Sequence, residues 1–257
     1  MSIIYEPRGR AREYGALAAN LYRGCAHGCL YCYAPAACRR KPGDFHVPAI
    51  RKDILDKLSE DVRKQRGHGE RVLLCFSCDP YQPLEATAHV TSRAIDILHA
   101  GGYTLQILTK GGLRAAGDFD KYKATDAFAT TLTFIRESDS RHWEPGAALP
   151  DERLEALALA HEKGITTWAS LEPVIDPKQS LALIEATLEC VDEYRIGPLN
   201  YNPIRRAINW GAFTREAVAT LEAAGKAYYL KRDLCELAGV TWHERTENFS
   251  SFFQESA

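Results

Sequence analysis

Short apolar runs rich in β-branched residues alternate along the chain with longer segments in which apolar residues recur every three or four positions. The first pattern predicts buried strands and the second predicts helices packed on them, so the alternation indicates repeated β/α units around a parallel sheet. Six such units are expected. Their strands lie at residues 17–22, 71–77, 103–109, 127–134, 165–171 and 193–199, and their helices at residues 50–65, 91–100, 150–163 and 177–188.

A further helix at residues 214–224, a strand at residues 226–230 and a helix from about residue 231 follow the sixth strand. No linker, repeat or low-complexity tract interrupts the series. One domain over residues 1–257 is therefore predicted, with a core of about residues 15–205 and an extension of about residues 206–257. The predicted fold class is α/β, a partial (β/α)6 TIM barrel with a short C-terminal α/β extension.

In barrels of parallel strands, the C-terminal ends of the strands and the loops that follow them form the active site. Several chemically active side chains occupy those positions here. They are Cys25, Cys29 and Cys32, then Ser77, Cys78 and Asp79, then Lys110, Thr131, Thr133, Glu172 and Asn200.

Composition gives a chain with a substantial core and a surface rich in charge. Apolar residues make up 46% and charged residues 26%, and no apolar run has the length of a membrane span. The first residues lack the apolar stretch of an export signal, so a cytoplasmic protein is expected. The net charge is only −2, but residues 1–52 hold nine Arg or Lys and three Asp or Glu. A basic face there and an ordinary solvated surface are both compatible with this imbalance.

Three cysteines follow the first predicted strand with C-x3-C-x2-C spacing, at positions 25, 29 and 32. The spacing is too short for any regular element between them, so one loop must fold around one object. Three thiolates suit an iron–sulfur cluster or zinc. A zinc site would need a fourth ligand, for which Cys38 is available, whereas three cysteines on a cubane cluster leave one iron open.

The same spacing, in a loop after the first strand of a β/α series, resembles the radical S-adenosylmethionine superfamily. Further stretches are similar to its spore photoproduct lyase-like, or DNA repair photolyase-like, group over about residues 15–205. They are NLYRGCAHGCLYCYA, DPYQPLE, ILTK, EPGAALPDERLEAL and SLEPVI. The resemblance implies a barrel of the radical SAM type and a 4Fe–4S cluster on the three cysteines. It also implies S-adenosylmethionine as cofactor, cleaved to a 5′-deoxyadenosyl radical that abstracts hydrogen from a substrate.

The resemblance also implies roles around the cofactor. Tyr31 matches the aromatic beside the adenine, and Ser77 to Asp79 stand where the family holds the methionine amino group. Lys110 matches a lysine that reaches the methionine carboxylate. Thr131 and Thr133 are expected at the ribose.

Other expectations keep two interpretations open. Tyr31 and Tyr33 correspond to two relay tyrosines of spore photoproduct lyase, or they simply pack on the cluster. Cys78 is expected to donate hydrogen or touch substrate, although its offset from Asp79 departs from the lyase pattern.

Two polar residues near the last strands also have two possible interpretations each. Glu172 contacts cofactor or substrate, or pairs with an arginine such as Arg195 or Arg205. Asn200 binds a base or sugar, or forms a turn before Pro203.

The resulting hypothesis is a radical enzyme that repairs or modifies a base in nucleic acid, with a flavodoxin or ferredoxin as electron donor and no membrane partner. The number of subunits is left open. A radical enzyme acting on a peptide or small metabolite is the first alternative. A nucleic-acid-binding module that holds zinc is the second.

Overall fold

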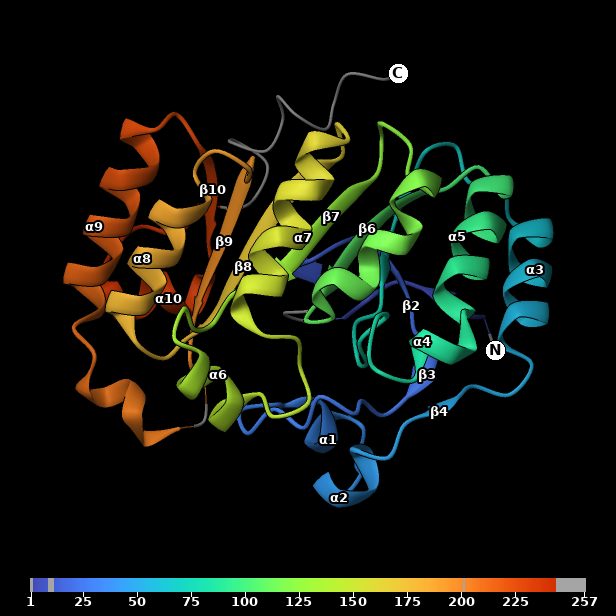
Figure 1. The fold of residues 1–257 in the computed structure, drawn as a ribbon, viewed down its shortest axis with the longest axis horizontal. Coiled ribbons are helices and arrows are strands. Elements are labelled where there is room, and N and C mark those ends of the chain that lie inside the picture. Colours follow the sequence, from blue (N-terminus) through green and yellow to red (C-terminus); the bar gives the residue numbers. More distant parts are fainter. Residues whose placement is uncertain (1, 9–11, 201, 244–257) are drawn as a thin grey trace.

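The computed structural model describes residues 2–8, 12–200 and 202–243 (Figure 1). The strands are β1 (Ile4–Tyr5), β2 (Leu17–Ala19), β3 (Tyr22–Arg23), β4 (Ala49–Ile50), β5 (Arg71–Leu74), β6 (Thr104–Thr109), β7 (Ala127–Thr131), β8 (Thr166–Val174), β9 (Glu193–Pro198) and β10 (Ala227–Leu230).

The α-helices are α1 (Ala34–Ala37), α2 (Pro42–Phe45), α3 (Ile54–Lys64), α4 (Glu85–Ala88), α5 (Val90–Ala100), α6 (Glu137–Trp143), α7 (Pro150–Glu162), α8 (Pro177–Thr187), α9 (Trp210–Ala223) and α10 (Arg232–Ala238). The segments η2 (Gly112–Lys121) and η3 (Pro203–Ala207) are 3-10 helices. Within the described residues, no helix combines the length and the apolar character that a bilayer span requires.

One sheet organises the fold, with strand order β1-β2-β5-β6-β7-β8-β9-β10 in the described part of the chain. From β2 to β10 every neighbouring pair is parallel, and only β1 runs antiparallel, beside β2. The two ends of this order do not meet, so the barrel is open. The predicted α/β class and partial barrel are confirmed, and the strand predicted at residues 226–230 continues the sheet as β10. The division into core and extension stays a prediction.

Several predicted boundaries are wrong, and each error lies where a non-local contact decides the backbone. The first strand ends at Ala19, because Tyr22 and Arg23 turn away to pair with Ile50 and Ala49 in a separate hairpin. The helix expected from residue 50 therefore begins at Ile54. Residues 75–77 and 132–134 also leave their strands and form loops. The 3-10 helix η2, which buries Gly112, Ala115 and Phe119, was not predicted.

The main core lies between the sheet and the helices that cover its outer face. Helix α3 shows why its sequence folds there: Ile54, Leu58 and Val62 recur every four positions, form one stripe and are all buried. Helices α7 and α8 each begin with a proline at the first turn, where the missing N–H costs nothing.

The inner face of the sheet has a second, smaller core around Trp168, packed with Ala127 and Ala129. The guanidinium of Arg195 lies 3.7 Å from the Trp168 ring centroid, and its Nε lies 2.6 Å from Glu193 Oε1. These buried charges inside the barrel are thus paired, as their desolvation requires.

Figure 1 shows α1, α2, α6, β3 and β4 together at one end of the molecule, which is the end where the parallel strands finish. This is the end at which the barrel rule expects the chemistry.

Candidate active site

The three cysteines lie in the loop between β3 and α1, which we call the cysteine loop (residues 24–33). Its first turn depends on Gly24, which has φ +84° and whose hypothetical Cβ would lie 2.2 Å from the carbonyl oxygen of Phe45. That carbonyl accepts a hydrogen bond from Cys25 N at 2.9 Å, and Cys32 N donates to Cys29 O at 3.1 Å. Backbone contacts therefore shape the loop before any metal binds.

Two separate segments hold the cysteine loop against the barrel. Ala26 N donates to the buried Gln82 side chain at 3.0 Å, and Leu30 N donates to Trp143 O at 2.9 Å. Gly146 N donates to His27 O at 2.8 Å. The loop is thus fixed from both sides, by the segment after β5 and by the segment after α6.

All three thiols are partly exposed and free of disulfides. Burial is the main cause that raises the pKa of each, to about 12 for Cys29, so the apoprotein holds protonated thiols and metal binding must release their protons. In the described ranges, no three His, Cys, Asp or Glu side chains converge closely enough to hold one metal ion.

Beneath the loop lies a buried network that sequence reasoning missed. The Tyr31 hydroxyl donates to Glu144 Oε1, and the Thr133 hydroxyl lies 3.2 Å from the same oxygen. Arg153 Nη2 lies 2.6 Å from Glu144 Oε2, and both side chains are essentially inaccessible to solvent.

The charges around this network keep Glu144 ionised and the Tyr31 hydroxyl protonated. Burial alone would raise the pKa of Glu144, but the positive charges of Arg153 and Lys110 outweigh it and hold that pKa below its usual value. Burial, followed by the Glu144 charge, raises the pKa of Tyr31 well above its usual value, so its hydroxyl stays a hydrogen-bond donor. The segment EPGAALPDER, already similar to the family, contains both Glu144 and Arg153, and was the available signal.

Lys110 follows the end of β6 beside the cysteine loop, with its Nζ 5.6 Å from the Tyr31 ring centroid. Burial disfavours its ammonium form, but the nearby Cys29 and Glu144 outweigh burial and raise the Lys110 pKa. The structure therefore places a permanent cation next to the expected metal ligands, where an anionic group of a cofactor could bind.

Asp79 connects the ends of two strands. Its carboxylate accepts hydrogen bonds from the Thr109 hydroxyl at 2.5 Å, from Lys110 N at 2.7 Å and from Tyr81 N at 2.9 Å. His27 Nδ1 lies 3.4 Å from it, and burial lowers the His27 pKa to about 4, so this imidazole is neutral. The expected contact between Asp79 and a methionine amino group stays a prediction, and the contacts that the structure does give are structural.

The other predicted residues after β5 and β7 reach the same end of the barrel. Ser77 N donates to the Asn20 side chain at 2.7 Å, and the Cys78 thiol lies 3.8 Å from the same oxygen. Thr131 and Thr133 are both buried, and the Thr133 hydroxyl already contacts Glu144, so a ribose would compete with this carboxylate.

Glu172 lies in β8 and contacts the Tyr14 hydroxyl and Lys231, whose Nζ is 3.6 Å away. Lys231 is buried and its Nζ also lies 3.6 Å from the Tyr14 ring centroid. The cation beside this carboxylate is thus a lysine from the start of α10, which no pattern in the sequence places there.

Asn200 contacts protein groups through both ends of its amide. Its Nδ2 donates to Asp233 at 2.8 Å, and its Oδ1 accepts from Arg205 at 3.1 Å. Asn202 caps η3 by accepting from Ile204 N at 3.0 Å, which supports the turn interpretation for that residue.

Tyr33 lies at the rim, with 49% of its surface exposed. Its hydroxyl is 3.4 Å from Phe76 O, and the two rings are 6.0 Å apart. Tyr31 and Tyr33 thus have different settings, one in a buried polar network and one at the protein surface.

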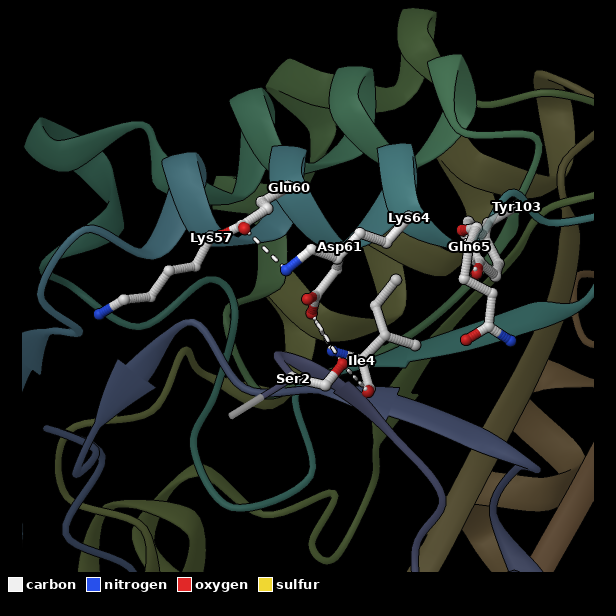
Figure 2. Close-up of a pocket in the computed structure, with 8 residues that line it drawn as sticks. All are labelled: Ser2, Ile4, Lys57, Glu60, Asp61, Lys64, Gln65 and Tyr103. Carbon is white, nitrogen blue, oxygen red and sulfur yellow. Dashed lines mark hydrogen bonds and ion pairs between the residues drawn. The ribbon is translucent and has the colours of Figure 1, made fainter.

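The pocket drawn in Figure 2 lies elsewhere, between β1 and α3. Asp61 lines it and accepts hydrogen bonds from the Ser2 hydroxyl and from Ile4 N. No thiol lines this pocket, and it plays no part in the site described above.

Comparison with known proteins gives a consistent picture. Residues 19–191 match the family described as the Radical SAM superfamily. An uncharacterized protein of Mycobacterium tuberculosis is 29% identical over 165 residues, covering 61% of this chain and 48% of that protein. One of Methanocaldococcus jannaschii is 26% identical over 159 residues, covering 61% and 59%. The chain thus spans about half the length of its mycobacterial relative.

Two groups of solved structures share the fold. Spore photoproduct lyase with bound AdoMet and dinucleoside spore photoproduct matches with a TM-score of 0.65 and 15% identity, over 84% of this chain and 76% of that one. Streptococcus suis SuiB bound to S-adenosylmethionine matches with a TM-score of 0.62 and 10% identity, over 91% and 53%.

Proposed function

Because this chain belongs to the radical SAM superfamily, we propose that it is a radical enzyme whose substrate is a lesion or a modified base in nucleic acid. The superfamily assignment makes it an enzyme that uses a 4Fe–4S cluster and S-adenosylmethionine, and it decides against the zinc-binding module. The nucleic-acid substrate, the repair or modification chemistry and a flavodoxin or ferredoxin donor are proposals.

One observation supports the substrate class most directly. Large exposed apolar side chains gather on and next to the cysteine loop, at Leu30, Tyr33, Val47 and Ile50. Arg39 and Lys41, between Tyr33 and Val47 in the sequence, are exposed as well. Exposed aromatic and apolar surface interleaved with cations is what stacked bases and phosphates bind. The fold shared with spore photoproduct lyase, solved with a dinucleoside lesion, points to the same class.

The protein groups have separable tasks in this proposal. Cys25, Cys29 and Cys32 would hold the cluster, which with S-adenosylmethionine supplies a 5′-deoxyadenosyl radical. Lys110 would bind the carboxylate of the cofactor, and Tyr31, held by Glu144, would form a wall of its site.

Two further residues would act on the substrate side. Cys78, partly exposed beside the cysteine loop, would return a hydrogen atom to the product. Tyr33 at the rim would contact the base. The departure of Cys78 from the lyase spacing favours a substrate other than spore photoproduct itself.

The chemistry is tested on anaerobically purified protein. With dithionite and S-adenosylmethionine, the wild type should be brown and should form 5′-deoxyadenosine and methionine, and Cys29→Ala should lose both properties. Cys190→Ala is the matched control, since this partly exposed thiol lies after α8, outside the site. A Cys29→Ala protein that retains full iron content would contradict the ligand assignment.

The substrate class is tested by binding of a fluorescent single-stranded oligonucleotide as a function of salt. Arg39→Ala with Lys41→Ala should weaken binding and reduce the salt slope by about 0.7 for each phosphate that is no longer neutralised. Lys163→Ala is the control, because Figure 1 places the end of α7 far from α1. If 5′-deoxyadenosine forms but no oligonucleotide binds, the peptide or metabolite alternative replaces this proposal.

A further inference from the structure

Two cysteines outside the cysteine loop lie together directly after β5, in the sequence Cys75-Phe76-Ser77-Cys78. Leu21 N donates to Cys75 Sγ at 3.5 Å, and Cys78 Sγ lies 3.8 Å from the side-chain oxygen of Asn20. Both thiols therefore lie against two consecutive residues that follow β2. The backbone contact from Ser77 N to the same Asn20 oxygen, at 2.7 Å, fixes the turn between them.

The two thiols lie against neighbouring residues and differ in exposure. Cys75 is buried with 5% of its surface exposed, whereas Cys78 is partly exposed. Burial raises the pKa of Cys75 well above its usual value, and a hydrogen bond with Cys78 and its charge raise it further. The pair thus has an accessible member at the site and a protected member behind it, with the C-x-x-C spacing common to dithiol redox centres.

We propose that Cys75 and Cys78 form a reversible disulfide during turnover, in which Cys75 captures the sulfur radical left on Cys78. This inference rests on the proposed function, because it needs Cys78 to give up a hydrogen atom.

Atoms and electrons balance in this step. The S–H bond of Cys78 breaks and its hydrogen atom passes to the carbon radical of the product. The Cys78 sulfur then bonds to the Cys75 sulfur, while the Cys75 proton leaves to solvent and one electron leaves for an acceptor; an oxidised iron–sulfur cluster held by the three cysteines would supply that acceptor. An added dithiol reductant resets the pair by thiol–disulfide exchange.

The dithiol is tested first in the apoprotein, without any radical chemistry. Trypsin releases residues 72–93 as one peptide whose only cysteines are Cys75 and Cys78. After equilibration with oxidised glutathione, this peptide should lose two hydrogen atoms in mass and both alkylatable thiols together. Cys75→Ser should instead leave a glutathione adduct on Cys78. The peptide of residues 179–195, which contains Cys190 alone, serves as the internal control because it can form only such an adduct.

An apoprotein peptide that keeps two free thiols, or that stops at a glutathione adduct on Cys78, would overturn the proposal. The turnover role is then tested on the cluster-loaded protein, reduced, freed of excess reductant and given S-adenosylmethionine alone in D2O. Thiol hydrogens exchange with D2O, so deuterium should enter 5′-deoxyadenosine and the disulfide should accumulate in peptide 72–93. Cys78→Ser should lose both signals, and Cys75→Ser should lose only the disulfide.

The two failures are distinguishable. If 5′-deoxyadenosine forms while peptide 72–93 stays reduced, the redox role is refuted and the proposed function stands. If no 5′-deoxyadenosine forms, the proposed function fails, whereas closure of the disulfide in the apoprotein still demonstrates the dithiol pair.

Discussion

The buried pair of Arg153 and Glu144 gives a stability prediction that tests the network beneath the cysteine loop. Arg153→Met removes the guanidinium and keeps an unbranched apolar side chain in place of the aliphatic part of the arginine. The Arg153 side chain has 1% of its surface exposed, and its guanidinium contacts Glu144 Oε2 at 2.6 Å, Ala148 O at 2.8 Å and Thr131 O at 3.0 Å. Removing one partner of a buried ion pair leaves the other charge without compensation, which typically costs about 3–5 kcal/mol. We expect a loss of this size.

The double variant Glu144→Gln with Arg153→Met removes both charges of the pair. It therefore separates the effect of an uncompensated charge from the effect of the altered side-chain shapes. Because this variant has no buried carboxylate without a counterion, its loss of unfolding free energy should be smaller than the sum of the two single losses by at least about 2 kcal/mol. Arg141→Met is the matched control. It breaks the pair of Arg141 with Glu137, also 2.6 Å apart, but 62% and 57% of these side chains are exposed. Its cost should stay below about 0.5 kcal/mol.

Urea unfolding of the apoprotein, followed by far-ultraviolet circular dichroism, measures the wild type, both single variants of the pair, the double variant and Arg141→Met without the cluster. If Arg153→Met loses no more stability than Arg141→Met, burial does not set the energy of the pair and the expectation is wrong. Strict additivity in the double variant would contradict it as well, because it would show that the two charges do not interact.

Three further outcomes follow from the site. Lys110→Ala should bind S-adenosylmethionine about ten- to a hundredfold more weakly with unchanged iron content, since a charged hydrogen bond contributes about 1.5–3 kcal/mol; unaltered affinity in isothermal titration would remove Lys110 from the cofactor site. Gly24→Ala should destabilise the apoprotein and lower its iron incorporation, because its Cβ would lie 2.2 Å from Phe45 O, whereas Gly69→Ala has a similar φ with open space around it and should retain full iron. The Glu144 pKa is lowered on folding, so this carboxylate should stabilise the fold at pH above its unfolded value of 4.5 and lose that effect as the pH falls through its lower folded value. Unfolding free energies of the wild type and Glu144→Gln should therefore converge in acid, and a gap that widens in acid would contradict the assigned shift.

Local patterns in the chain were enough to predict the fold class, the order of the β/α units and the cysteine loop. The apolar period distinguishes strand from helix within a short window, and the spacing of Cys25, Cys29 and Cys32 confines three thiols to one loop whatever surrounds it. The barrel rule then assigned Lys110 and Cys78 to the same end, because parallel strands finish together.

The partners of the polar groups, in contrast, became known only from the folded chain. Tyr31 lies 113 residues before the Glu144 that it contacts, and Lys231, after β10, meets Glu172 of β8 over the intervening strand β9. Such pairs have no period and no fixed spacing, since they are selected by the cost of burying a charge without a counterion. The first strand is shorter than predicted for a related reason. The backbone N–H and C=O groups of residues 22–23 pair with residues 49–50, which lie too far along the chain for a short sequence window to contain both.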